Sequence, residues 1–86
     1  MELKVFTLPA CPTCPAAKAV AIDVAQKLGI AFREISLASE EGVREGLALD
    51  ICGTPSIALD GEVIIRGRFV SAEKLEEEVQ KRISKH

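Results

Sequence analysis

Residues 8–18 read LPACPTCPAAK, in which two cysteines are separated by two residues and each is followed by a proline. Apolar residues lie on both sides of this pair, Cys11 and Cys14. The same spacing occurs in redox couples that exchange disulfides, in halves of metal sites and in structural cross-links. A third cysteine, Cys52, lies far along the chain in DICGTPSIALDG, residues 50–61. Which chemistry applies depends on the fold around these segments.

The residues around the pair predict a strand followed by a helix. Residues 3–8, LKVFTL, form a short apolar segment closed by Pro9, which is typical of a buried strand. In residues 16–28 apolar side chains repeat every four positions, which is the period of a helix face. Gly29 supplies the stop at the C-terminal end of this helix. We therefore expect Cys11 in the turn that leads from the strand into the helix.

A second strand and a second helix are predicted next. Residues 31–37, AFREISL, alternate apolar and polar side chains, as a strand does. Ser39, followed by two glutamates, predicts the start of a helix that ends by Gly53. Gly42 and Gly46 each cost this helix up to about 1 kcal/mol, so we expect it to be the least stable element. Its apolar residues are Val43, Leu47 and Leu49.

The last third of the chain predicts a hairpin and a closing helix. Residues 56–59 and 62–65 read as two strands joined by Asp60-Gly61, and this dipeptide is a strong signal for a tight hairpin turn. Ser71 predicts the N-cap of a final helix that runs through about Ser84. The predicted order of elements is therefore βαβαββα.

This order predicts a single α/β domain that covers residues 1–86. The first strand-helix-strand unit requires a right-handed parallel crossover, whereas the hairpin turn requires an antiparallel pair. A four-stranded mixed sheet flanked by three helices, with helices on both faces, satisfies both requirements. A chain of 86 residues can bury one modest core but not two.

Composition and charge exclude several classes of function. With 48% hydrophobic and 28% charged residues, the chain resembles an ordinary soluble protein. Its net charge is -2, its acidic and basic residues are interleaved along the chain, and only 3% of its residues are aromatic. The sequence therefore predicts neither a basic surface for nucleic acid or an anionic membrane nor aromatic residues on which bases could stack. No stretch approaches the roughly 20 apolar residues that span a bilayer, and the N-terminus lacks a signal-peptide pattern. We expect a cytoplasmic protein, and a monomer.

The number of possible ligands favours redox chemistry over a metal site. In the cytoplasm, closely spaced cysteines are more often catalytic or metal-binding than structural. Beyond Cys11 and Cys14, a tetrahedral zinc site would have to recruit Cys52 and His86. A zinc or iron-sulfur site that bridges two chains stays an alternative.

The predicted position of Cys11 favours its ionised form. A thiol at a strand-to-helix turn meets unpaired N–H groups and the positive end of the helix dipole, which favour the thiolate.

Disulfide exchange gives the two cysteines separate roles. The thiolate of Cys11 is expected to attack a substrate disulfide, and Cys14, one turn later, to attack the resulting mixed disulfide. Pro12 suits the first helical position, where no N–H is needed. Pro15 removes an N–H near the helix start, so it could tighten or distort the first turn. Because the electrons reside in the two sulfurs, we expect no metal or organic cofactor.

With FTLPACPTCP after the first strand and GTPSIALDG before the hairpin, the chain resembles a small member of the thioredoxin/glutaredoxin superfamily over nearly its whole length. The resemblance implies a minimal thioredoxin fold and a thiol-disulfide oxidoreductase that reduces protein disulfides. It also implies that the Thr54–Pro55 bond is cis, faces the cysteine pair and aligns the substrate backbone. The partners it implies are disulfide-containing target proteins and an upstream enzyme of the thioredoxin-reductase type.

The sequence departs from typical glutaredoxins at the positions that hold glutathione. Leu8 replaces a basic residue before the first cysteine, and Thr13 replaces an aromatic residue between the cysteines. Residues 66–70, RGRFV, replace a Gly-Gly-x-x-Asp segment, although Arg66 or Arg68 could supply one anchor. The resemblance is therefore to compact, glutaredoxin-sized thioredoxins and redoxins. A glutathione-linked glutaredoxin stays an alternative.

The sequence also lacks the buried acid that in typical thioredoxins accepts the proton of the second cysteine. Val5 occupies the matching place in the first strand. Glu2, Lys4, Lys18 or water are the substitutes that the sequence offers.

Four further residues are candidates with weaker signals. Cys52 is expected to be a small buried residue, with a functional third thiol as the alternative. Lys18, one helical turn after Cys14, is more often a solvated lysine than a modulator of a thiol. Thr13 is expected to be the most exposed member of the motif and to shape contact with partners. Phe69 is expected in the core, with contact to a substrate as the alternative.

Overall fold

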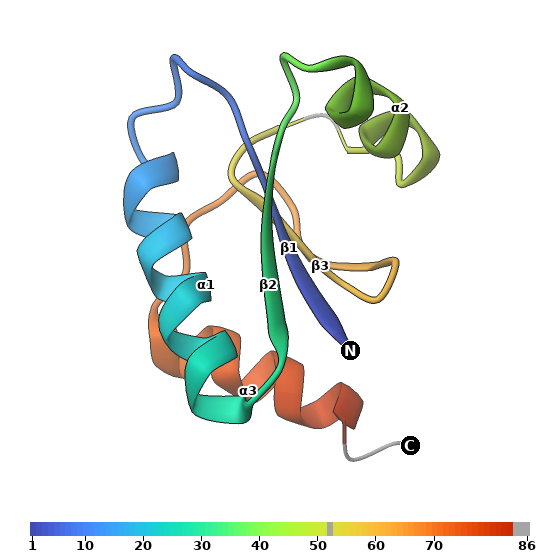
Figure 1. The fold of residues 1–86 in the computed structure, drawn as a ribbon. Helices are drawn as coiled ribbons and strands as arrows, with labels where there is room; N and C mark the ends of the chain where they lie inside the picture. Colours follow the sequence, from blue (N-terminus) through green and yellow to red (C-terminus); the bar gives the residue numbers. More distant parts are fainter. Residues whose placement is uncertain (52, 84–86) are drawn as a thin grey trace.

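The structure is a computed structural model that describes residues 1–51 and 53–83. Its elements follow the predicted order βαβαββα (Figure 1). They are β1 (Glu2–Thr7), α1 (Cys14–Leu28), β2 (Ala31–Ser36), α2 (Glu40–Ala48), β3 (Ser56–Leu59), β4 (Glu62–Ile65) and α3 (Ala72–Ile83). Within these described residues, none of the helices is long and apolar enough to cross a membrane.

The predicted four-stranded mixed sheet is confirmed. The strand order is β2-β1-β3-β4, with β1 parallel to β2 and antiparallel to β3. In the turn between β3 and β4, Asp60 and Gly61 have φ angles of 49° and 86°. Both angles lie in the left-handed region that a tight hairpin turn requires, and this explains the choice of Asp-Gly.

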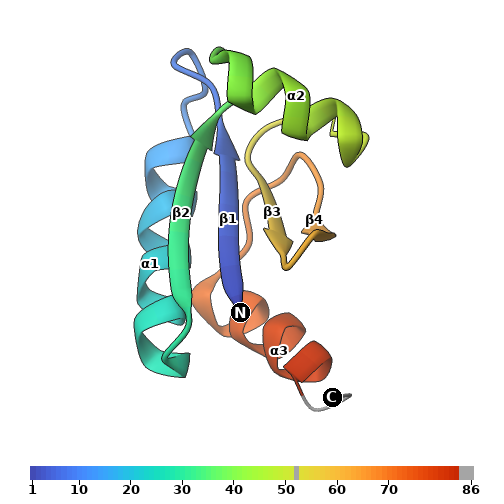
Figure 2. The same ribbon diagram turned by 45° about the vertical axis from the view of Figure 1, so that its right-hand side comes forward.

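Alternation along β1 separates its side chains between two layers. Leu3 and Val5 pack with the buried residues of α1 and α3, and Phe6 belongs to a second cluster on the opposite face, with Ile35 and Ala58. Figure 2 shows α1 and α2 on opposite sides of the sheet. Because side chains alternate in a strand, Thr7 lies on the same face as Val5, the face that α1 covers.

The contact face of α2 contains its two glycines rather than Val43 and Leu47. Its apolar residue Leu47 is 78% exposed and Val43 is also exposed, whereas Gly42 and Gly46 are buried. A Cβ atom on Gly42 would overlap the carbonyl oxygen of Ser36 at the end of β2. The glycines that weaken the isolated helix are therefore the residues that allow it to approach the sheet.

Polar contacts add to this close packing of α2. The Lys4 ammonium lies 2.6 Å from a carboxylate oxygen of Glu45, and this hydrogen bond is the main cause that raises the pKa of Lys4 above its usual value. Arg66 donates a hydrogen bond of 2.8 Å to the carbonyl oxygen of Asp50, just after the helix. Ser39 caps the helix as predicted, accepting a hydrogen bond from the backbone N–H of Gly42.

Two other predictions about individual residues are corrected or confirmed by the fold. Phe69 is exposed, so its assignment to the core was wrong; it follows the turn after β4 and is not part of a strand or helix. Ser71 accepts a hydrogen bond of 3.2 Å from the backbone N–H of Lys74, which agrees with its predicted role as the cap of α3.

We predict that Gly42→Ala lowers the free energy of unfolding by about 1 to 3 kcal/mol, a typical cost of overpacking. The added methyl group meets the backbone of Ser36, which cannot move without shifting β2. The measurement is urea unfolding followed by circular dichroism, because the chain contains no tryptophan or tyrosine.

Gly46→Ala is the matched control for this prediction. There the added methyl group would lie 2.9 Å from Cδ2 of Leu37, the movable end of a side chain. We expect a smaller loss than for Gly42→Ala. A Gly42→Ala variant as stable as the wild type would show that the close approach of α2 to β2 is not a constraint.

Candidate active site

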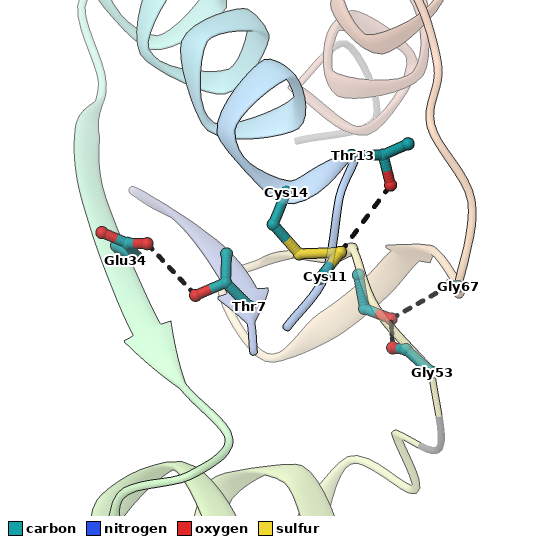
Figure 3. The surroundings of a disulfide bond; sticks show 8 residues. Thr7, Cys11, Thr13, Cys14, Glu34, Gly53 and Gly67 are labelled. Carbon is teal, nitrogen blue, oxygen red and sulfur yellow. Dashed lines mark hydrogen bonds between the residues drawn. A yellow bond between two sulfur atoms is a disulfide. The ribbon is translucent and has the colours of Figure 1, made fainter. Parts of the chain in front are cut away.

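The two cysteines of the motif form a disulfide in the structure. Cys11 lies in the loop after β1, and Cys14 is the first residue of α1. Their Cα atoms are 5.4 Å apart, within the usual range for a disulfide. Cys14 is only 4% exposed, whereas Cys11 is partly exposed. Figure 3 shows the bridge between the start of the helix and the preceding loop. The sulfur accessible to another molecule is therefore that of Cys11.

The loop before α1 gives Cys11 a polar neighbour. The Cys11 N–H donates a hydrogen bond of 3.1 Å to the carbonyl oxygen of Leu8, which closes a turn. Thr13 is the N-cap residue of α1, but its side chain makes no capping hydrogen bond. Its hydroxyl oxygen lies 3.7 Å from the sulfur of Cys11 instead. Because a disulfide sulfur carries no hydrogen, the hydroxyl is the donor in this contact.

The charge at the start of α1 also favours a thiolate. The first turn of α1 contains no acidic residue, in contrast to the first turn of α2, which contains Glu40 and Glu41. Nothing in the first turn of α1 therefore offsets the positive end of its dipole, which stabilises negative charge nearby.

The structure changes the assignment of the two prolines. The helix begins at Cys14, two residues later than the predicted start at Pro12, so Pro12 precedes it and does not occupy its first position. Pro15 follows in the first turn, where backbone N–H groups have no partner inside the helix. The N–H that Pro15 lacks would have no carbonyl partner inside the helix at this position, and the effect of Pro15 on the turn stays a prediction. Both prolines are exposed.

The segment around Pro55 is fastened to the loop that follows β4. The Thr54–Pro55 bond is cis in the structure, and the Pro55 carbonyl oxygen accepts a hydrogen bond of 3.1 Å from the N–H of Arg68. The buried Ser56 hydroxyl donates to the carbonyl oxygen of Gly53 at 2.6 Å and accepts from the N–H of Gly67 at 3.1 Å. Figure 3 draws these two glycines among the surroundings of the disulfide. Contact between Pro55 and a substrate stays a prediction.

A cavity of about 410 Å³ borders the disulfide. Both cysteines line it, together with Leu8, Pro9, Pro15 and three polar residues. The polar residues are Thr7, Glu34 and Ser36. An open space of this size beside the sulfurs is large enough to receive a group of the substrate.

Glu34 is held in this cavity by two donors. The hydroxyl of Thr7, a residue only 6% exposed, donates to one carboxylate oxygen at 3.1 Å. The ammonium of Lys18 lies 3.0 Å from the other oxygen. The hydrogen bond from Lys18 is the main cause that lowers the pKa of Glu34; Thr7 adds to this effect, and partial burial opposes it. Glu34 is therefore a carboxylate at neutral pH.

Thr7 and Glu34 were not among the site residues predicted from the sequence. Parallel pairing aligns Val5 with Glu34 and Thr7 with Ser36, so both polar side chains reach the face that α1 covers. The available signal was the alternation in residues 31–37, which puts Glu34 on the opposite face from Ile35. Lys4, which the sequence offered as a substitute acid-base group, pairs with Glu45 at α2 instead.

The remaining candidates have less definite outcomes. Lys18 is not simply solvated, because it forms the ion pair with Glu34. Cys52 lies outside the described residues, so its predicted burial stays a prediction. Within residues 1–51 and 53–83, no group of three or more His, Cys, Asp or Glu side chains is arranged to hold a metal ion.

Comparison with known proteins identifies the family. Residues 1–80 match a family model described as a thioredoxin domain. A thioredoxin from Methanocaldococcus jannaschii is 31% identical over 86 residues, which is 96% of each chain. A probable thioredoxin from Archaeoglobus fulgidus is 34% identical over 65 residues, which is 76% of this chain and 71% of that protein.

Solved structures show the same fold. Thioredoxin 1 from Thermosipho africanus superposes with a TM-score of 0.76 at 16% identity and covers 98% of this chain and 96% of its own. A thioredoxin-like protein with 27% identity superposes with a TM-score of 0.57, covering 88% of this chain and 97% of that one. With its cysteine pair at the start of α1, this chain belongs to the thioredoxin family and is a thiol-disulfide oxidoreductase.

Proposed function

We propose that this protein reduces disulfides in target proteins, with Cys11 as the attacking residue and Cys14 as the resolving residue. The unequal exposure of the two cysteines carries this proposal, since Cys14 is only 4% exposed and Cys11 is partly exposed. The hydroxyl of Thr13 supports it, because it can donate to the Cys11 thiolate once the disulfide is reduced.

The reaction consists of two exchanges. The Cys11 thiolate forms a bond to one sulfur of the substrate disulfide; the substrate S–S bond breaks, and the departing thiolate takes a proton from water. Cys14 then loses its proton to water and attacks the sulfur of Cys11; the bond between Cys11 and the substrate breaks, and the second substrate sulfur leaves as a thiolate that takes a proton from water. Two electrons have passed from the dithiol to the substrate. No metal or organic cofactor takes part.

The exposed part of the motif is the proposed contact surface for the target. Pro12 and Thr13 are exposed beside Cys11, and the segment Thr54–Pro55 aligns the substrate backbone. An upstream enzyme of the thioredoxin-reductase type returns two electrons to the Cys11–Cys14 disulfide. We propose that this cycle runs in the cytoplasm, where such thiol pairs act as catalysts rather than as permanent cross-links.

Contacts of Arg66 argue against the glutaredoxin alternative. Its guanidinium donates to the carbonyl oxygen of Asp50, so one of the two arginines that could anchor glutathione serves to hold the end of α2. The comparison to make is reduction of a protein disulfide with a thioredoxin reductase against reduction of a small mixed disulfide with glutathione. Faster turnover with glutathione would favour the glutaredoxin function.

The metal-bridged alternative has a separate experiment. Metal analysis and absorbance of the freshly purified protein distinguish a redox carrier from a zinc or iron-sulfur module shared by two chains. A stoichiometric metal that chelators remove would overturn the proposed function. We expect none, together with one pair of thiols that is oxidised and reduced reversibly.

We predict that Cys14→Ser accumulates mixed disulfides with target proteins through Cys11, because the resolving step is lost. Cys11→Ser is the control and is expected to accumulate none, because Cys14 is buried. Non-reducing electrophoresis followed by mass spectrometry of the trapped complexes measures both variants. If Cys11→Ser trapped targets and Cys14→Ser did not, the two roles would be exchanged.

We also predict that Thr13→Ala slows alkylation of the reduced protein at Cys11 by up to about fivefold at pH values below the pKa of the Cys11 thiol. The loss of one hydrogen bond to the thiolate, about 1 kcal/mol, lowers the ionisation constant of the thiol by about this factor, and the ionised fraction follows it in this pH range. Thr13→Ser keeps the hydroxyl and should react almost as the wild type does. The rate of reaction with iodoacetamide as a function of pH measures the effect. Equal rates for the alanine and serine variants would show that the hydroxyl does not act on Cys11.

A further inference from the structure

The cavity beside the disulfide has one charged group in its lining, the carboxylate of Glu34. The other lining residues are the two cysteines, apolar or proline residues, and two with hydroxyl groups. A substrate whose disulfide reaches Cys11 therefore brings its neighbouring groups close to this single charge. The volume of the cavity, about 410 Å³, lies in the range of sites that bind small molecules or single side chains.

The Glu34 carboxylate is held by two donors but still has free acceptor positions for hydrogen bonds. Each of its oxygens takes one of the two donors, Thr7 and Lys18. Ionised carboxylates have about four acceptor positions in total, so both oxygens can accept a further hydrogen bond. Lys18 approaches from α1 and does not line the cavity. A cation inside the cavity would therefore contact Glu34 directly, while the Lys18 ammonium, 3.0 Å from one oxygen of this carboxylate, would oppose it through its charge.

We propose that this cavity is a charge-selective subsite in which Glu34 favours disulfides flanked by a cationic group. In a target protein, the cation is the ammonium or guanidinium of a lysine or arginine close to the reacting cysteine. This inference rests on the proposed reduction of disulfides through Cys11 and adds a substrate class to it. Lys18 limits the preference because its charge partly cancels that of Glu34.

The expected effect is moderate for physical reasons. The side chain of Glu34 is 39% exposed, so water and salt screen its charge. We expect a discrimination of about threefold to fivefold between cationic and anionic substrates at low ionic strength, the upper range for exposed ion pairs. The discrimination should fall as salt is added.

Three small disulfides of different charge test the inference directly. They are cystamine, which is cationic, bis(2-hydroxyethyl) disulfide, which is neutral, and 3,3'-dithiodipropionate, which is anionic. The reduced protein is mixed with each, and its loss of thiols gives a rate constant without any upstream reductase. Each rate is divided by the rate of the same disulfide with free 2-mercaptoethanol, which removes differences in intrinsic reactivity. Because the same sulfur attacks all three, the cation-to-anion ratio is independent of how reactive Cys11 is.

Two substitutions should move this ratio in opposite directions. Glu34→Gln leaves the Lys18 charge without its partner, so the cation-to-anion ratio should fall at least threefold. Lys18→Met leaves the Glu34 charge uncompensated, so the ratio should rise. The rate with the neutral disulfide shows whether each variant still folds and reacts. Glu41→Gln is the matched control, since Glu41 forms a similar ion pair with Arg33 at 2.6 Å but does not line the cavity.

The outcomes separate this inference from the proposed function. An unchanged ratio in Glu34→Gln, or an equal change in Glu41→Gln, would overturn the subsite while leaving reduction by Cys11 intact. Variants that shift the ratio in the same direction would also overturn it. Failure of the wild-type dithiol to react with all three disulfides would overturn the proposed function and the subsite together.

Discussion

The parallel pairing of β1 with β2 is the constraint on which the site depends. Both strands have their C-terminal ends at the same end of the sheet. The helix that connects them, α1, begins at this end. This arrangement brings Cys14 at the start of the helix close to Thr7 at the end of β1. The register then adds Glu34 from the neighbouring strand. A shift of one residue between the strands would turn Glu34 to the opposite face and remove it from the cavity.

Close packing on the other face of the sheet imposes a second constraint, which conflicts with local helix preference. Glycine is a poor helix former, yet Gly42 is the residue that allows α2 to lie against the end of β2. The exposed Val43 and Leu47 show that apolar character alone does not identify the buried face of this helix. Its position depends on the close contact between its backbone and the end of β2, on the ion pair of Lys4 with Glu45 and on the hydrogen bond from Arg66 to the Asp50 carbonyl oxygen.

Features with local physical causes could be predicted from the sequence. The Asp60-Gly61 turn, the caps at Ser39 and Ser71 and the order of the elements each depend on neighbouring residues, and the structure confirms them. The start of α1 was predicted two residues too early, at Pro12, because a proline suits the first helical position; in the structure the helix begins at Cys14 and Pro15 fits its first turn. The exposure of Phe69 and the role of Glu34 could not be predicted. The exposure of Phe69 and the partners of Glu34, which are Thr7 and Lys18, depend on residues distant in the chain.

Typical thioredoxins carry a buried acid in the strand before the cysteine pair, whereas β1 has Val5 there, and the carboxylate near the disulfide comes from Glu34 in β2. Val5 is fully buried among apolar side chains, where an unpaired carboxylate would be costly. Glu34 lies on the neighbouring strand, partly exposed and bonded to Lys18 and Thr7. Its pKa is lowered, so it keeps its charge through the neutral range and does not store a proton. A carboxylate of this kind acts on the dithiol and on its substrates as a fixed negative charge, and the strength of that charge is set by Lys18.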